Sequence, residues 1–174
     1  MQKDFSNVLL ISDLDDTLLT KSKEITQKDR ASIDEFIRKG GSFTVATGRV
    51  YESAMPYIKK LNITHPCIMY NGGMIFNTKN EEVLWKCTLP ANAKDYVVEV
   101  LDAFPEVAAE ILIGKEIYVP KFNKILENKM VMERVNCITC TMEDVPDNWI
   151  KVLFTLDHDL IPEVAEFIES RNFE

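Results

Sequence analysis

The segment Asp13-Leu14-Asp15-Asp16-Thr17 carries the residues of this 174-residue chain that are best suited to chemistry. It directly follows a short apolar run, so its acids stand at the end of a predicted buried strand. Two neighbouring carboxylates raise each other's pKa unless they share a proton or a cation. A bound Mg²⁺ would let Asp13 stay ionised as a nucleophile while Asp15 carries a proton. This division of roles suits phosphoryl transfer through an aspartyl-phosphate.

The elements that must position these acids follow an alternating strand and helix order. The first apolar run lacks polar alternation, which is typical of a strand buried on both faces. Strands are predicted over residues 8–11, 43–46 and 67–70. A helix should run from the N-cap Thr26 to a stop at Gly40-Gly41, and a second over 50–61, where Pro56 should kink or restart it. The order favours a doubly wound α/β core with a parallel sheet.

Three polar or glycine-rich segments follow the three predicted strands, at residues 12–17, 47–49 and 71–73. Because parallel strands end at the same edge of a sheet, we expect the three segments to converge there, where such folds bind ligands. Taken singly, each segment is as compatible with a solvated turn as with a site. Their joint occurrence, in order, favours a site.

After Gly73 the pattern changes from crossovers to hairpins, which marks a second unit. Hairpins are predicted at 74–85 and 111–118, helices at 91–103, 121–135 and 162–171, and a strand at 149–156. We place residues 1–79 in the first unit and 80–174 in the second.

In this context Asp13 to Leu19 resembles the first motif, Asp-x-Asp-x-Thr, of the haloacid dehalogenase (HAD) superfamily of phosphatases. The resemblance implies that Asp13 attacks phosphorus and binds Mg²⁺. It also implies that Asp15 acts as acid and base and binds the metal through its carbonyl, while the Leu14 N–H contacts phosphate. Asp16 occupies a position that is usually Gly in the family. Since Asp tolerates left-handed backbone, the turn should survive this change.

Two further segments extend the resemblance. Thr47-Gly48 resembles the second HAD motif, in which a hydroxyl and an amide at a helix N-terminus bind phosphate. Arg49 follows directly and would add positive charge near the anion. Asn71-Gly72 is similar to the Asn-Gly found after the third strand in the Cof-type branch, so Arg49 and Asn71 are implied to lie near the substrate.

The resemblance implies a Rossmann-like HAD core of three strands over residues 1–79 and an α/β cap over 80–174, both incomplete. No segment matches the third and fourth HAD motifs, a phosphate-binding Lys and a second acidic loop. We therefore expect this chain to be a fragment with weak or no activity. The strand before Asp13 should form an exposed sheet edge, through which copies could self-associate.

Composition restricts the other functions. The net charge of -8 argues against a nucleic-acid binder, and no apolar run is long enough for a membrane span, so we expect a cytoplasmic protein without a membrane partner. Cys137 and Cys140 have zinc-knuckle spacing but no second pair near them, which favours ordinary thiols.

The implied substrate is a small phosphorylated metabolite such as a sugar phosphate, since a large cap admits small substrates. Glu110, Lys115 and Tyr118 are candidate pocket residues, although salt bridges or cross-strand pairs explain them better. Two alternatives remain open: a non-catalytic module that binds phosphate or a metabolite, and phosphotransfer to an acceptor other than water, as in a mutase.

Overall fold

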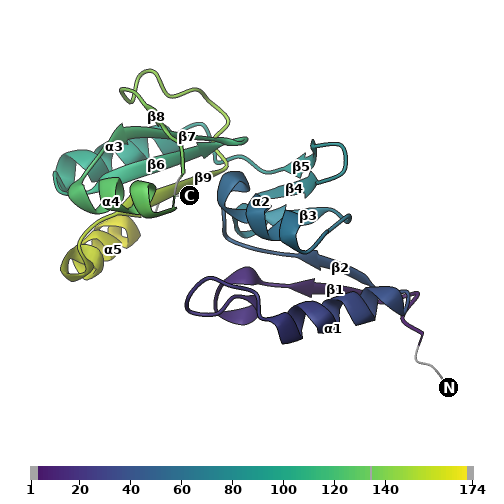
Figure 1. Cartoon of the computed structure of the whole chain (residues 1–174). Helices are drawn as coiled ribbons and strands as arrows, with labels where there is room; N and C mark the ends of the chain where they lie inside the picture. The colour runs from purple at the N-terminus through teal and green to yellow at the C-terminus, as the bar shows by residue number, and fades with distance from the viewer. Residues whose placement is uncertain (1–3, 134, 172–174) are drawn as a thin grey trace. The chain divides into compact units, whose positions relative to one another are not determined.

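The computed structural model describes residues 4–133 and 135–171, and the chain divides into two compact units after Cys87 (Figure 1). The sequence places the boundary after residue 79 instead. The difference is the hairpin of β4 (Met74–Asn77) and β5 (Glu82–Lys86), which pairs with β3 (Cys67–Met69) in a three-stranded antiparallel sheet of the first unit. Each unit is a mixed α/β structure.

The first unit contains the predicted parallel strands. β1 (Leu9–Ser12) pairs in parallel with β2 (Ser42–Val45), with Leu9 opposite Ser42. β3 runs along the other side of β2 through a parallel bridge between Ala46 and Ile68, where the Thr47 N–H donates to the Ile68 carbonyl at 2.9 Å. The spatial order is therefore β1, β2, β3, so the three strands end at a common edge.

Helix α1 (Gln27–Arg38) has the predicted limits because local signals set both of its ends. The Thr26 hydroxyl accepts the Asp29 N–H at 3.0 Å at the N-terminus, and Gly40 takes the left-handed conformation after the last turn, with φ 91°. Helix α2 (Tyr51–Lys60) continues through Pro56, so the helix does not restart there. Buried side chains beside the proline, among them Met55, anchor the helix in the core and compensate for the lost hydrogen bond.

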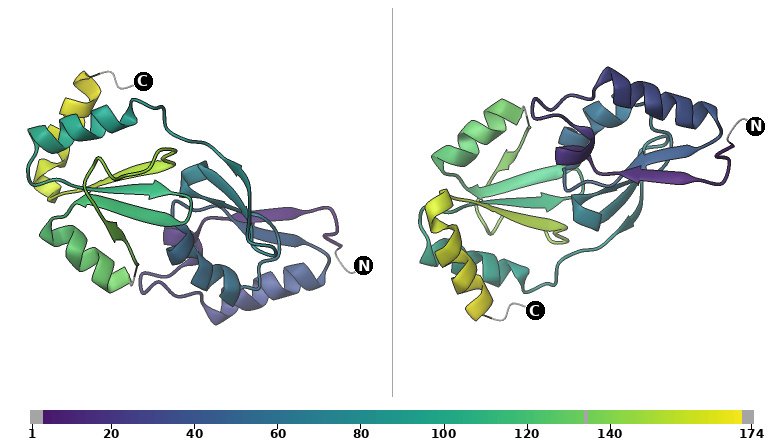
Figure 2. Two further views of the ribbon diagram at one scale, coloured as in Figure 1. Left: turned by 90° about the horizontal axis from the view of Figure 1, so that it is seen from above. Right: turned by 90° about the horizontal axis from the view of Figure 1, so that it is seen from below.

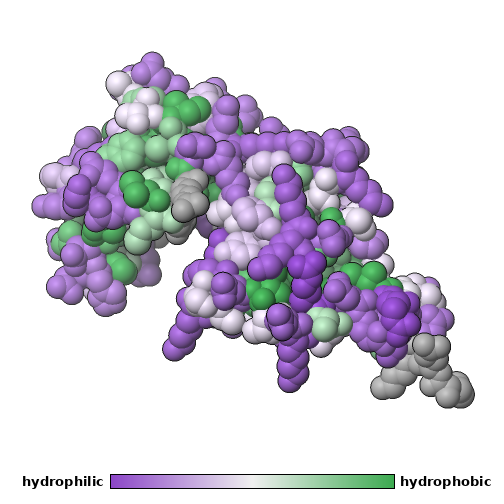
Figure 3. Space-filling model, viewed as in Figure 1, coloured by the Kyte–Doolittle hydropathy of each residue, from purple (hydrophilic) through white to green (hydrophobic). Residues whose placement is uncertain are grey.

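The prediction that β1 is buried on both faces is wrong. The apolar residues Val8 to Ile11 are each 45–55% exposed, because β2 is the only strand that pairs with β1 among residues 4–133 and 135–171. Apolar side chains gather over β1 on the surface shown in Figure 3. The strand is an open sheet edge, as the resemblance implied.

The second unit is a sheet with helices on both faces. Its strands are β6 (Ala108–Ile113), β7 (Glu116–Lys121), β8 (Ile138–Thr139) and β9 (Lys151–Thr155), in the order β8-β7-β6-β9. Helices α3 (Ala93–Ala103) and α5 (Ile161–Ser170) lie on one face, and α4 (Lys124–Glu133) lies on the other (Figure 2). The sequence predicts these helices and the β6–β7 hairpin. Only the two-residue strand β8 has no counterpart in the prediction.

Alternate residues of the central strand β6 face opposite sides of its sheet. Ala109 and Ile111 pack in a core cluster with residues of α3. Glu110 points the other way and is 3% exposed, with its carboxylate 2.8 Å from the Lys129 ammonium of α4. The Tyr118 hydroxyl donates to the Glu116 carboxylate at 2.7 Å. Glu110 therefore makes an ion pair, although a buried one rather than the surface salt bridge that the sequence favoured, and Tyr118 bonds to a residue of its own strand rather than across strands.

Two further expectations concern cysteines and membranes. All four cysteines are free thiols, and Cys137 and Cys140 flank β8. Burial raises the pKa of the Cys67 and Cys137 thiols above the ordinary range, which makes them less reactive. Within the described part of the chain, no helix has the length and apolar character needed to cross a membrane.

Candidate active site

The three predicted site segments meet at the carboxyl ends of the parallel strands. The Ala46 N–H donates to the Ser12 carbonyl at 2.9 Å, which joins the ends of β2 and β1. The Asn71 N–H donates to the Thr47 carbonyl at 3.1 Å, and the Tyr70 N–H donates to the Arg49 carbonyl at 3.3 Å. These bonds connect residues that lie far apart in the sequence, so tertiary structure assembles one site from three strand ends.

The first segment is a tight turn whose backbone explains its residue types. Asp13 is extended, and its carboxylate accepts the Leu14 N–H at 2.7 Å. Leu14 is fully buried beneath the turn, while Asp16 takes the left-handed conformation with φ 55°. The expectation that Asp can replace the usual Gly at this position is confirmed. The Leu14 amide, implied to bind phosphate, is occupied here by the Asp13 carboxylate.

The second and third segments pack directly against each other. Thr47 is 4% exposed and its hydroxyl accepts the Arg49 N–H at 3.2 Å. A Cβ at Gly48 would lie 2.8 Å from the Asn71 amide nitrogen, so any other residue at this position would force the Asn71 side chain to move. Asn71 itself has φ 57°, which Asn tolerates better than most residues. The structure thus brings Thr47, Gly48 and Asn71 together.

Asp15 lies between two cations. Arg49 binds it in a bidentate manner, with Nε 2.7 Å from Oδ2 and Nη2 2.8 Å from Oδ1, and the Lys23 ammonium lies 2.6 Å from Oδ1. The hydrogen bonds from Arg49, followed by those from Lys23, hold the pKa of Asp15 at about 2 despite partial burial. In this arrangement the Asp15 side chain is ionised at neutral pH.

Sequence reasoning missed Lys23 and Tyr57. Lys23 sits in the loop after the first motif with φ 59°, and its carbonyl accepts the Tyr57 hydroxyl of α2 at 3.1 Å. The Arg49 guanidinium lies over the Tyr57 ring, 4.9 Å from its centroid. Neither residue belongs to a motif, and the loop conformation that directs Lys23 toward Asp15 leaves no periodic signal in the sequence.

The donor set near Asp13 fits a sparsely ligated Mg²⁺. Mg²⁺ in phosphate-handling sites is commonly held by one or two carboxylates together with water and substrate phosphate. The Asp13 carboxylate and the Asp15 carbonyl would be the protein's oxygen donors to such an ion, whereas the Asp15 carboxylate is engaged by Arg49 and Lys23. Across residues 4–133 and 135–171 there is no group of three or more acidic, histidine or cysteine side chains able to hold a metal. Substrate and water would have to supply most of the ligands.

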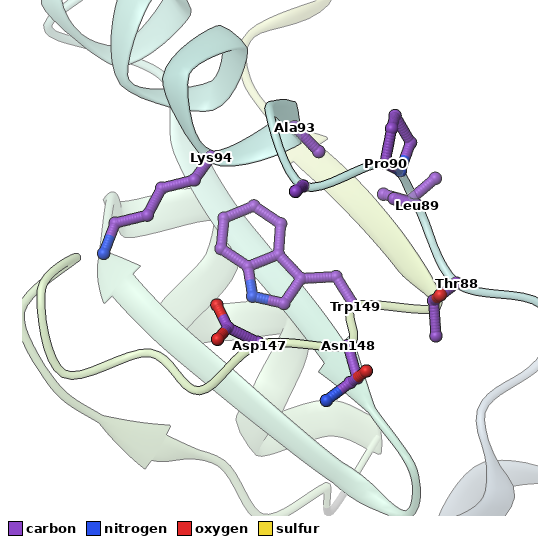
Figure 4. A pocket seen from close by; sticks show the side chains of 9 residues that line it. Thr88, Leu89, Pro90, Ala93, Lys94, Asp147, Asn148 and Trp149 are labelled. Carbon is purple, nitrogen blue, oxygen red and sulfur yellow. The ribbon is translucent and has the colours of Figure 1, made fainter.

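The second unit holds a cavity of about 340 Å³, which is lined by Thr88, Leu89, Pro90, Ala91, Ala93, Lys94, Asp147, Asn148 and Trp149 (Figure 4). The Trp149 side chain is largely buried and its indole N–H donates to the Pro146 carbonyl at 2.6 Å. Lys94 and Asp147 are the charged residues of the lining. The residues predicted for the active site all lie in the first unit, so none of them lines this cavity.

Comparison with known proteins shows the family of the chain. The family model of haloacid dehalogenase-like hydrolases matches residues 10–174. The chain is 21% identical over 170 residues to the 5-amino-6-(5-phospho-D-ribitylamino)uracil phosphatase YitU of Bacillus subtilis, covering 95% of this chain and 62% of that protein.

Solved structures share the fold at low identity. A haloacid dehalogenase-like hydrolase from Bacteroides thetaiotaomicron superposes with a TM-score of 0.80 at 20% identity, covering 94% of this chain and 64% of the other. The HAD subclass IIB sugar phosphatase BT4131 superposes with a TM-score of 0.76, also at 20% identity and with the same coverage of 94% and 64%. The chain thus spans less than two thirds of these proteins. It belongs to the haloacid dehalogenase-like hydrolase family, in the Cof-type branch of the HAD superfamily.

Proposed function

We propose that the active site formed by the first unit hydrolyses small phosphomonoesters with the help of Mg²⁺, through an aspartyl-phosphate on Asp13. The observation that carries this proposal is the convergence of Asp13, Thr47 and Arg49 at one strand edge. A nucleophile, a phosphate-binding hydroxyl and a cation are the groups that phosphoryl transfer requires. Family membership supports the same reaction class.

In the proposed reaction an Asp13 carboxylate oxygen attacks phosphorus and the bond from phosphorus to the ester oxygen breaks. Asp15 donates a proton to the leaving oxygen, then removes a proton from the water that attacks the aspartyl-phosphate and releases phosphate. The Thr47 hydroxyl and the amides of Leu14 and Gly48 bind the phosphate oxygens. Bound Mg²⁺ would supply charge neutralisation during transfer. Because Asp15 is ionised while its cations hold it, it must first separate from them and take up a proton from solvent before it can donate one.

We place the substrate among phosphate esters of sugars or polyols. Two similar proteins are named as a sugar phosphatase and as a phosphatase of a phosphoribitylamino compound. We assign the second unit as the α/β cap, which in the proposed function limits the substrates to small molecules. Asn71, packed on Gly48 beside Thr47, is the core residue we expect nearest to the part of the substrate beyond the phosphate.

By themselves the 174 residues should turn over slowly or not at all, because the described residues supply few metal ligands. The alternative function, a module that binds phosphate or a metabolite without turnover, rests on this same observation. Both functions use Thr47, Gly48 and the turn at Asp13. They differ in whether Asp13 reacts.

An assay with an aryl phosphate, with Mg²⁺ or with a chelator, tests the proposal. We expect slow turnover that the chelator and Asp13→Asn abolish, while the control Asp34→Asn, an exposed change on α1, leaves it intact. Phosphate binding without turnover would support the binding module instead. Turnover that survives Asp13→Asn would refute the mechanism.

We also propose that copies of this chain self-associate through the open edge of β1. Four consecutive apolar residues, Val8 to Ile11, are exposed there, and an unpaired apolar edge is a template for strand pairing. The partner strand would be β1 of a second copy.

A further inference from the structure

Two cations converge on one carboxylate at the site, and both are held there by other contacts. Arg49 makes the bidentate contact to Asp15, donates to the Ser53 carbonyl at 3.2 Å and lies over the Tyr57 ring. Its side chain is 20% exposed, while that of Lys23 is 52% exposed. The Asp15 carboxylate therefore accepts hydrogen bonds from a rigidly held guanidinium, that of Arg49, and from a solvent-accessible ammonium, that of Lys23.

The loop around Lys23 is folded rather than extended. Leu19 and Ile25 form an antiparallel bridge, and the Thr20 N–H donates to the Glu24 carbonyl at 2.9 Å. The Lys23 N–H donates back to the Thr20 carbonyl at 2.9 Å, and the Lys23 carbonyl accepts the Tyr57 hydroxyl. The backbone of Lys23 is thus held by hydrogen bonds within its own loop and by the Tyr57 hydroxyl of α2. This backbone position directs the Lys23 ammonium toward Asp15.

This donor set suits phosphate at least as well as it suits a carboxylate. A guanidinium fork and an ammonium recognise planar or tetrahedral oxyanions through charge-assisted hydrogen bonds. Phosphate offers more oxygens and nearly twice the charge of Asp15, and charge strengthens each such bond. At present the Asp15 carboxylate oxygens accept the hydrogen bonds of both cations.

We propose that Lys23 and Arg49 form a phosphate-binding cation pair that Asp15 occupies in the absence of phosphate and releases when phosphate binds. The proposal rests on the function proposed above, adds Lys23 as a substrate-binding residue and gives Arg49 a direct contact with phosphate. It also provides a means for Asp15 to leave its ion pairs and approach the leaving oxygen. The proposal predicts that Asp15 and phosphate compete for Lys23 and Arg49.

Binding of inorganic phosphate to the intact chain, measured by isothermal titration calorimetry, tests the pair directly. Loss of one charge-assisted contact should weaken binding about tenfold in Lys23→Met and in Arg49→Met. The matched control is Lys21→Met, an exposed lysine of the same loop, which should bind within about twofold of the parent. Lys23→Arg keeps the charge and should retain most of the affinity. Far-UV circular dichroism verifies that each variant is folded.

The competition gives a second readout that a structural role would not produce. Asp15→Asn should strengthen phosphate binding to the parent chain several-fold, because the neutral side chain no longer competes with phosphate for Lys23 and Arg49. The same substitution made in the Lys23→Met variant should strengthen phosphate binding much less. Equal affinities of the Lys23→Met and Lys21→Met variants would overturn the proposal, as would failure of the parent to bind phosphate at tens of millimolar. These outcomes are independent of the turnover assay with Asp13→Asn, so the two proposals can fail separately.

Discussion

Replacing Lys129 with methionine should lower the free energy of unfolding of the second unit by about 2 kcal/mol. Lys129 reaches from α4 to Glu110 on the central strand β6, with Nζ 2.8 Å from one carboxylate oxygen and 3.1 Å from the other. The Glu110 side chain is 4% exposed, whereas that of Lys129 is 33% exposed. The substitution therefore leaves the buried Glu110 carboxylate without its ion-pair partner. The Lys129 ammonium that it removes is partly exposed to water.

The magnitude follows from what remains around Glu110. Losing one partner of a fully buried ion pair costs about 3–5 kcal/mol. Two features reduce this cost here. The Thr155 hydroxyl still donates to Glu110 at 3.1 Å, and Lys151 on β9 lies close enough for its pKa to respond to Glu110. Burial and the nearby Lys129 lower the pKa of Lys151, so removing Lys129 strengthens Lys151 as a substitute cation.

Urea unfolding followed by Trp149 fluorescence measures this unit alone, provided that Trp85 of the first unit is replaced by phenylalanine. The matched control is Lys124→Met on the same helix, whose side chain is 80% exposed in its pair with Glu127, and it should change stability by less than about 0.5 kcal/mol. Glu110→Leu combined with Lys129→Met should recover most of the loss, since an apolar pair replaces the ion pair. A Lys129→Met midpoint equal to that of the control would refute the reasoning.

Three further predictions concern the first unit. Asp16→Gly should raise the free energy of unfolding by up to about 1 kcal/mol because φ is 55°, and Asp16→Val should lower it; a lower urea midpoint for the glycine variant would contradict this. Gly41→Ala should cost about 1–2 kcal/mol, since the new Cβ would lie 2.4 Å from ring carbons of Phe36; an unchanged midpoint would show that the ring moves freely. Leu10→Lys, on the exposed face of β1, should convert oligomers to monomers in light scattering, and a parent chain that is already monomeric would refute self-association.

Local signals let the sequence predict the elements and most of the site. The Thr26 cap and the Gly40 turn act within a few residues, so the limits of α1 are readable directly. Asp13, Thr47 and Asn71 were predicted to converge because parallel strands end at one edge, and the hydrogen bonds between their segments confirm the convergence. Their catalytic and binding roles remain proposals.

Burial and long-range pairing needed the tertiary structure. The apolar run at β1 reads as a buried strand, but burial depends on which neighbours are present, and only β2 pairs with β1 among the described residues. The contact of Asp15 with Arg49 joins residues 34 positions apart, and that with Lys23 requires a folded loop.

By itself the sequence determined the family, the strand and helix order, and the motif at Asp13, because these depend on residue type and local spacing. The tertiary structure decided that Asp15 is held by two cations and that the Asn71 side chain packs directly on Gly48. Such contacts depend on side-chain directions at the ends of separate elements, and no periodicity in the sequence encodes those directions.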